Sequence, residues 1–267
     1  MVRAKKHLGQ HFLTDPAIAR RIVDALHPEQ GETVIEVGPG TGVLTALMIE
    51  EEMNLVPVEI DRESVAYLRK KWPVLNEKLI EGDFLNLNLE MFMGEKLHII
   101  GNFPYNISSQ IIFKVLDHRH KVSSVVCMLQ KEVAERIASP PGSKAYGILS
   151  VLVQAFYDVS YLFSVKPGSF HPPPKVTSGV IRLERNQIAA LPCDEILFFR
   201  VVKTVFNQRR KMIRNSLRPI LLNIDSAYEK LTKRPEQLSV QEFIDLTLWV
   251  ATQQNQGFVD PEKPAQS

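Results

Sequence analysis

Short apolar segments alternate with amphipathic segments along the first two-thirds of the chain, and this alternation restricts the possible folds more than any other feature. The longer segments carry apolar residues at helical spacing, whereas the shorter ones are apolar almost throughout, as buried strands are. Because successive parallel strands need a helical crossover, the alternation predicts a doubly wound, mainly parallel α/β sheet. The expected strands are residues 33–37, 55–60, 78–80, 97–101 and 123–129, and the expected helices are residues 16–27, 43–52, 63–72 and 108–116.

Two further strand-like segments follow, at residues 157–165 and 176–184, and a loop with the run Pro172-Pro173-Pro174 joins them. Because no helical crossover separates them, we expect the pair to form an antiparallel edge on the sheet. Beyond residue 186 the strand pattern ends and only helical patterning continues. The sequence therefore predicts a first domain at residues 1–186, a small all-α domain at residues 187–252 and a polar, disordered tail at residues 253–267.

The composition is that of an ordinary globular protein, with 45% hydrophobic and 23% charged residues. No apolar run approaches the roughly 20 residues that a membrane-spanning helix needs, and the basic N-terminus is not followed by the apolar core of a signal peptide. We therefore expect a cytoplasmic monomer that does not associate with a membrane. The two cysteines and seven histidines lack metal-ligand spacing, so no metal site is expected.

A glycine-rich turn, Glu36 to Gly42, connects the first expected strand to the next helix. Gly38 and Gly40 allow a tight turn in which a ligand approaches backbone amides at a helix N-terminus. Two carboxylates follow the next two strands. Glu59 is placed to accept both hydroxyls of a ribose, and Asp83 is placed to accept from an adenine amine. Together these residues predict a site for S-adenosylmethionine.

A nicotinamide dinucleotide is the alternative ligand for such a turn. The glycine spacing is Gly-x-Gly-x-Gly, and Val43 stands where the dinucleotide fingerprint has its last glycine or alanine. Glu36, which precedes the first glycine, suits a cationic sulfonium cofactor and would repel a pyrophosphate. Both features favour S-adenosylmethionine. For Asp83 taken alone, a structural role as a turn residue after Gly82 is the alternative.

The segment Gly101-Asn102-Phe103-Pro104-Tyr105 follows the fourth expected strand, at the edge where open α/β sheets bind ligands. An adenine amine is a poor nucleophile because its lone pair is delocalised into the ring. The side-chain oxygen of Asn102 and the carbonyl oxygen of Pro104 would accept from its N–H groups and stabilise the charge that develops as it attacks a methyl sulfonium. Tyr105 offers a stacking face for the base. Phe170 is equally a second stacking face or an ordinary core residue.

Positive charge is concentrated in two stretches, although the formal net charge is only +2. The first fourteen residues contain no acid, and neither does the stretch from residue 200 to residue 218. Such strips on a near-neutral protein suit a polyanion held against one face. The basic residues of the second stretch are Arg200, Lys203, Arg209, Arg210, Lys211, Arg214 and Arg218.

Several motifs together make the chain similar to a known family over roughly residues 5 to 250. They are Gly9 to Leu13, Glu36 to Gly42, Gly101 to Tyr105, Met128 to Glu132, Ser143 to Gly147, Phe170 to Val176 and Phe206 to Lys211. The chain resembles the KsgA/RsmA (Dim-type) family of small-subunit ribosomal RNA adenine dimethyltransferases. The resemblance implies a Rossmann-like class I methyltransferase sheet with a small C-terminal all-α domain. It also implies S-adenosylmethionine-dependent dimethylation of two adjacent adenosines in a hairpin loop near the 3′ end of 16S rRNA, within a small-subunit precursor.

The same resemblance implies roles for single residues. His11 and Leu13 would contact the cofactor through the N-terminal segment, Gly38 would lie under its methionine part, and Asn102 would lie between cofactor and target base. The run from Asn207 to Lys211, expected on a helix of the small domain, would clamp RNA phosphates. The RNA-binding residues that we expect are Arg209, Arg210, Lys211 and Arg214.

Two positions depart from the family pattern, because His11 replaces an asparagine and Phe103 replaces a leucine. Two other functions also stay open. One is dimethylation of large-subunit rRNA, against which the run Phe206 to Lys211 and the proline-rich loop argue. The other is a ribosome-assembly factor whose binding matters more than its catalysis.

Overall fold

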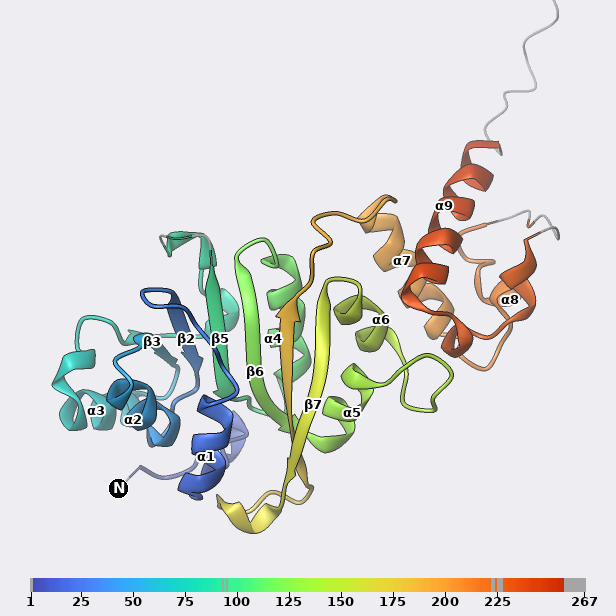
Figure 1. Ribbon diagram of the computed structural model, residues 1–267. Coiled ribbons are helices and arrows are strands. Elements are labelled where there is room, and N and C mark those ends of the chain that lie inside the picture. The colour runs from blue at the N-terminus through green and yellow to red at the C-terminus, as the bar shows by residue number, and fades with distance from the viewer. Residues whose placement is uncertain (1, 93, 95, 222–223, 225–227, 257–267) are drawn as a thin grey trace, which may run out of the picture. The chain divides into compact units, whose positions relative to one another are not determined.

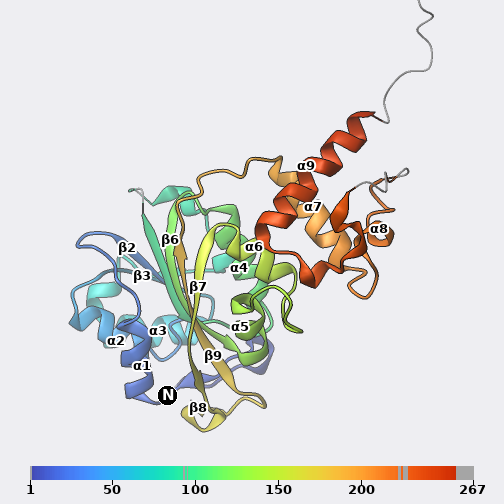
Figure 2. The same ribbon diagram turned by 45° about the vertical axis from the view of Figure 1, so that its right-hand side comes forward.

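The computed structural model describes residues 2–92, 94, 96–221, 224 and 228–256, which pack as two compact units (Figures 1 and 2). The first unit holds the chain up to Ala138 together with Phe156–Gln187. The second holds Ser139–Ala155 together with the chain from Ile188 onward.

The first unit is built on a seven-stranded sheet in the order β4-β3-β2-β5-β6-β9-β7. The first five of these strands pair in parallel, whereas β9 pairs antiparallel with both of its neighbours. The predicted mainly parallel sheet with an antiparallel edge is therefore confirmed. The strands are β2 (Thr33–Val37), β3 (Asn54–Glu59), β4 (Ile80–Glu81), β5 (Leu97–Asn102), β6 (Val122–Gln130), β7 (Tyr157–Val165) and β9 (Ser178–Arg185).

The strand order reverses between β2 and β5, which pair in parallel with Thr33 opposite Leu97. From β2 the chain proceeds outward through β3 and β4, and it then returns to place β5 on the other side of β2. At such a reversal, the crossovers leave a crevice outside the carboxyl ends of the two central strands. The glycine-rich turn follows β2, and the segment Gly101 to Tyr105, which we call the reactive segment, begins at the end of β5, so both lie at this crevice.

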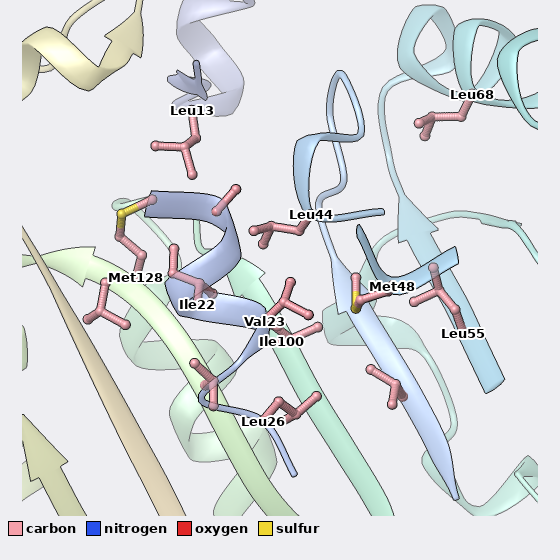
Figure 3. Close-up of a cluster of buried hydrophobic side chains, with 14 of the residues drawn as sticks. Leu13, Ile22, Val23, Leu26, Leu44, Met48, Leu55, Leu68, Ile100 and Met128 are labelled. Carbon is pink, nitrogen blue, oxygen red and sulfur yellow. The ribbon is translucent and has the colours of Figure 1, made fainter. Parts of the chain in front are cut away.

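Helices cover both faces of the sheet, as parallel sheets require. On one face, α1 (Pro16–Val23), α2 (Val43–Glu50) and α3 (Arg62–Lys71) share an apolar core with the strands. Figure 3 shows side chains of α1 and α2 directed toward Ile100 on β5 and Met128 on β6. The helices α4 (Ser108–Asp117) and α5 (Lys131–Ala138) follow β5 and β6, and α5 packs on β6, β7 and β9. Helix α1 ends at Val23, four residues before the predicted end at residue 27.

A second, two-stranded sheet was not predicted. It pairs β1 (Phe12–Leu13) antiparallel with β8 (Phe170–His171). Leu13 lies opposite Phe170, and both side chains are buried in the same core cluster. This pairing joins the N-terminal segment to the proline-rich loop, although the two are some 160 residues apart. The short 3-10 helices are Lys6–Leu8, Pro73–Leu75, Phe84–Asn86, Leu89–Met91, Pro167–Ser169, Glu229–Thr232 and Pro235–Gln237.

The described part of the second unit is helical, with α6 (Ile148–Gln154), α7 (Glu195–Phe206), α8 (Ile213–Ser216) and α9 (Val240–Gln256). The sequence-based domains were contiguous and placed residues 139–155 in the first one. In the structure α6 instead contacts α7 and α9. The five residues Leu149–Val153 are all buried, and a helix that is apolar on every side needs neighbours on every side.

The predicted tail, residues 253–267, begins too early, because α9 continues through Gln256. Residues 257–267 lie outside the described residues.

Close packing between β2 and β5 leads to a test of stability. A methyl group at position 101 would lie 2.5 Å from the carbonyl oxygen of Val37 and 3.3 Å from the Phe103 ring. Gly101→Ala should therefore lower the free energy of unfolding by about 1–3 kcal/mol through overpacking, as measured by urea denaturation. Gly168→Ala is the matched control, because its methyl group would meet nothing within 4 Å. Equal stability of the two variants would contradict this interpretation of the β2–β5 packing.

Candidate active site

A cavity of about 170 Å³ lies at the carboxyl ends of β2, β3 and β4. Five of the residues proposed from the sequence line it together: Gly38, Gly40, Glu59, Asp83 and Pro104. They come from four separate loops, so only the fold brings them to one place. We refer to this space as the cofactor cavity.

Glu59 is buried at the end of β3 and is held by two backbone amides. The amide of Gly40 donates to Oε2 at 2.9 Å, and the amide of Asp61 donates to Oε1 at 2.8 Å. Burial raises the pKa of Glu59 above its usual range, while these N–H groups counteract the rise. Each carboxylate oxygen keeps a lone pair for a further donor, so the side chain can accept ligand hydroxyls without leaving its place.

The turn after β2 can form only with glycine at some positions. Gly40 has φ +58°, and a methyl group there would come within 2.7 Å of the Phe12 ring. Gly38 has φ +68°, but a methyl group there would meet nothing within 4 Å. The backbone at Gly38 is therefore open toward the cavity that it lines, as a ligand that approaches the main chain requires.

Asp83 has a structural role as well as a place in the cavity lining. Its side chain accepts from the Leu85 amide at 2.9 Å and from Nδ2 of Asn86 at 3.2 Å. The turn-residue alternative is thus correct in part. Lone pairs remain on its oxygens, so the carboxylate can also accept from a ligand amine in the cavity.

The reactive segment begins where β5 ends. Nδ2 of Asn102 donates to the backbone carbonyl of His11 at 2.7 Å. This bond fixes the orientation of the carboxamide and leaves its oxygen, Oδ1, as an acceptor. Phe103, which departs from the family pattern, is buried at 1% exposure, and its amide donates to the Met128 carbonyl. The Pro104 carbonyl already accepts from the Ile107 amide at 3.2 Å, so it has one lone pair left for a substrate.

A second cavity, of about 570 Å³, is lined by Tyr105, His11 and the proline-rich loop. The Tyr105 hydroxyl lies 2.6 Å from the Ser178 hydroxyl, and Nδ1 of His11 donates to the Pro172 carbonyl at 2.8 Å. The rings of His11 and Tyr105 are 5.7 Å apart and inclined by 31°. We call this space the base cavity, since its aromatic lining suits a flat ring. His11 thus faces the base cavity with its side chain, while its backbone carbonyl holds Asn102.

Three residues proposed for the site line neither cavity: Asn102, Leu13 and Phe170. Asn102 stands at the end of β5 between Gly101 and Phe103, whereas Leu13 and Phe170 are 3% and 4% exposed and belong to the core cluster that α1 shares with the strands, where Figure 3 shows Leu13. The geometry therefore favours the core alternative for Phe170. For Leu13, any influence on a cofactor would be exerted through the position of the N-terminal segment.

Sequence reasoning missed residues whose role depends on tertiary contacts. Lys114 on α4 donates to the carbonyls of Leu85 at 2.9 Å and Leu87 at 2.6 Å, which fixes the loop that follows Asp83. Lys5 forms an ion pair with the buried Asp61 and so holds the N-terminal segment beside the cofactor cavity. Ile60, next to Glu59, is 50% exposed and offers the cavity an apolar face. Nothing local in the sequence distinguishes these residues.

In the second unit, the basic run Asn207 to Lys211 forms a turn after α7, so its predicted place on a helix is wrong. Helix α7 ends at Phe206, whose side chain is packed against Phe243. The Arg209 guanidinium donates to the Ser143 carbonyl at 3.3 Å and lies 3.8 Å from Glu236. Arg209 thereby anchors the turn, whereas three basic side chains beyond it are exposed: Arg210, Lys211 and Arg214.

Neither a metal-binding cluster nor a membrane-spanning helix is found in the part of the chain that the structure describes. No group of three or more histidine, cysteine, aspartate or glutamate side chains is arranged to hold a metal ion. None of the helices in that part combines the length and apolar character needed to cross a membrane.

Comparison with known proteins bears on this arrangement directly. The family model described as ribosomal RNA adenine dimethylase matches residues 1–251. The chain belongs to this family. As a ribosomal RNA adenine dimethylase, it is a methyltransferase that depends on S-adenosylmethionine, and the alternative of a nicotinamide dinucleotide enzyme is excluded.

Individual relatives of this dimethylase agree with the family match. A protein from Cytophaga hutchinsonii is 56% identical over 92% of this chain and 96% of its own, and one from Bacteroides fragilis is 53% identical over 92% of both chains. Both are named ribosomal RNA small subunit methyltransferase A. The crystal structure of a dimethyladenosine transferase from Plasmodium falciparum has the same fold, with a TM-score of 0.78 and 24% identity over 91% of this chain and 98% of that one.

The buried carboxyl of Glu36, behind the glycine turn, leads to a prediction for the dimethylase. Its Oε2 accepts from the Thr45 hydroxyl at 2.6 Å, and burial raises its pKa from 4.5 to about 8. Between these two values the folded protein keeps the proton that the unfolded chain releases. The free energy of unfolding should therefore fall as the pH rises through this window, by up to about 1.4 kcal/mol per pH unit.

Glu36→Gln should lower this slope, because glutamine resembles the protonated acid and still accepts from Thr45; the buried Glu59, whose pKa is also raised, keeps its own contribution of the same sign. Urea unfolding from pH 5.5 to pH 8 measures the slope. The exposed Glu77→Gln is the control and should keep the wild-type slope. A slope in Glu36→Gln that equals that of the wild type would contradict the role of Glu36.

Proposed function

We propose that this chain transfers methyl groups from S-adenosylmethionine to the exocyclic amine of adenine in small-subunit ribosomal RNA. The family match and the names of relatives more than 50% identical support the reaction and the choice of subunit. The observation that carries the mechanism is the hydrogen bond from Asn102 to the His11 carbonyl, since it fixes the carboxamide and leaves its oxygen Oδ1 free to accept from a substrate.

The reactive segment separates the two cavities. Pro104 lines the cofactor cavity, Tyr105 lines the base cavity, and Gln10 lines both. We propose that a base stacked on Tyr105 presents its edge to Asn102, three residues before Tyr105 in the chain. Gly38, Gly40 and the adjoining carboxylates would hold that cofactor, as the resemblance implies.

Bound S-adenosylmethionine supplies an electrophilic methyl group. In the first transfer Oδ1 of Asn102 and the Pro104 carbonyl accept from the two N–H groups of the adenine amine, and in the second transfer one of them accepts from the single N–H that remains; this favours a tetrahedral nitrogen with its lone pair free to attack. The nitrogen–carbon bond forms as the carbon–sulfur bond breaks, and the excess proton leaves to water. No side chain needs to act as a general base.

The finer assignment rests on the same proposal. We propose that two adjacent adenosines of a hairpin loop near the 3′ end of 16S rRNA are each dimethylated, in a small-subunit precursor in the cytoplasm, by a monomer. Arg210, Lys211 and Arg214 are exposed and would hold RNA phosphates. Arg209 would contribute mainly by anchoring the turn that carries Arg210 and Lys211 and that leads to Arg214 on α8.

Asn102→Ala tests the reaction. The variant should lose about a hundredfold or more in kcat, because it lacks the oriented acceptor, while its affinity for small-subunit particles should stay within a few fold of wild type. The assay offers labelled S-adenosylmethionine with small and large ribosomal subunits from an unmethylated strain. The exposed Asn76→Ala is the control and should keep full activity.

Label in the large subunit alone would overturn the proposed substrate in favour of the large-subunit alternative. Loss of particle binding in Asn102→Ala would show that catalysis and binding are not separable at this residue. Normal particle maturation by an inactive variant that still binds would favour the assembly-factor alternative.

The exposed basic residues after α7 give a separate prediction. Replacing Arg210, Lys211 and Arg214 by alanine should weaken binding to the RNA particle and lower the slope of log affinity against log salt by about 2 to 3, since each phosphate contact releases roughly one counterion. Filter binding between 50 mM and 300 mM salt, on the order of physiological values, measures the slope. Lys70→Ala on α3 is the control. An unchanged slope in the triple variant would mean that these three exposed side chains do not contact RNA phosphates.

A further inference from the structure

A smaller cavity, of about 290 Å³, continues the base cavity on the side of α5. The two cavities share two lining residues, Gln130 and Val176. The remaining lining comes from Thr177 and from the first turns of α5. A polymer that places one base in the base cavity would therefore extend naturally into this second space. We call it the neighbour cavity.

The place of Gln130 follows from the sheet register. Asn102 lies opposite Met128 at the end of β5, so Gln130 stands two residues farther along the adjacent strand. On its other side Gln130 pairs with Ser178, whose hydroxyl holds the Tyr105 hydroxyl. Gln130 is thus held in the sheet beside Ser178, the hydrogen-bond partner of Tyr105, and it lines the base cavity together with Tyr105.

The side-chain carboxamide of Gln130 forms no hydrogen bond that would stabilise the fold within the described residues. The side chain is half-buried. A carboxamide in such a place can donate and accept at once, which matches the amine and N7 of an adenine. Val176, 43% exposed, offers an apolar surface beside it for the face of a base.

The charges around the neighbour cavity are compatible with the binding of an anionic polymer. Lys131 pairs with Glu135 at 3.5 Å, and Glu132 pairs with Arg136 at 2.8 Å, so the acids of α5 are neutralised along the helix. The lining of the base cavity adds two exposed cations, Lys6 and Lys175, which suit backbone phosphates.

We propose that the neighbour cavity binds the nucleotide adjacent to the target adenosine and that Gln130 makes it selective for adenine. This inference rests on the proposed function and adds a second base-recognition subsite to it. Because the cavity lies on one side of the target only, it can read a neighbour on one side only. If two adjacent adenosines are methylated, Gln130 should therefore matter for one of them and not for the other.

The test uses small-subunit particles reconstituted with rRNA in which the nucleotide on either side of the target adenosine is replaced. With wild-type enzyme, replacing adenine by cytosine on one side should lower kcat/KM on the order of tenfold, the size of a lost bidentate contact. Gln130→Leu should abolish this discrimination and leave S-adenosylmethionine binding unchanged. Gln110→Leu, at an exposed position of α4, is the matched control and should discriminate as wild type does.

A second variant should acquire a new base preference, which a variant that merely fails to fold could not show. Gln130→Glu has only acceptors and should shift the preferred neighbour from adenine toward cytosine, whose amine it can accept from. Wild-type discrimination that persists in both Gln130 variants would overturn the subsite. If the wild-type enzyme methylates the particle with no preference for either neighbour, the subsite alone fails. If it methylates no adenine in the particle, the proposed function fails.

Discussion

The structure depends on how closely β2 and β5 approach at their carboxyl ends. Only a hydrogen atom fits between Cα of Gly101 and the Val37 carbonyl, since even a methyl group would come within 2.5 Å of that oxygen. The residues that follow these two positions are the glycine turn and Asn102. This contact therefore sets the distance between the glycine turn, which lines the cofactor cavity, and Asn102, which we expect to face the base. The parallel pairing of β2 with β5, which begins at Thr33, maintains that distance.

The N-terminal segment converts that crevice into two separate cavities. It is fixed at one end by the ion pair of Lys5 with Asp61 and at the other by the pairing of β1 with β8. Between these points the His11 carbonyl accepts from Asn102, and Gln10 contacts both spaces. Histidine in place of the usual asparagine is compatible with this role, because the backbone carbonyl makes the contact that orients Asn102.

The sequence predicted that Gly38, Gly40 and Glu59 come together, because the requirements at these positions are local. A tight turn needs glycine at Gly40, and Glu59 is marked by its place at the end of a strand. Other features depend on contacts between distant segments. The burial of Phe170 depends on a two-residue strand partner, Leu13, too short to leave a pattern, and the place of α6 depends on the helices that surround it. Gln130 belonged to one of the motifs that carry the family resemblance, but the sequence assigned it no role, since its place beside Ser178 depends on the pairing of β6 with β9.

The buried carboxyls explain why the glycine turn favours a cationic ligand. Glu36 and Glu59 repel each other, and the pKa of Glu36 rises to about 8 through burial and through this repulsion. A positive charge in the cofactor cavity would relieve the repulsion and favour the ionised form of Glu36. By linkage, ionisation of Glu36 must then favour the cation to the same degree. A pyrophosphate would have the opposite effect on both groups, so this pair of acids favours a sulfonium cofactor over a dinucleotide.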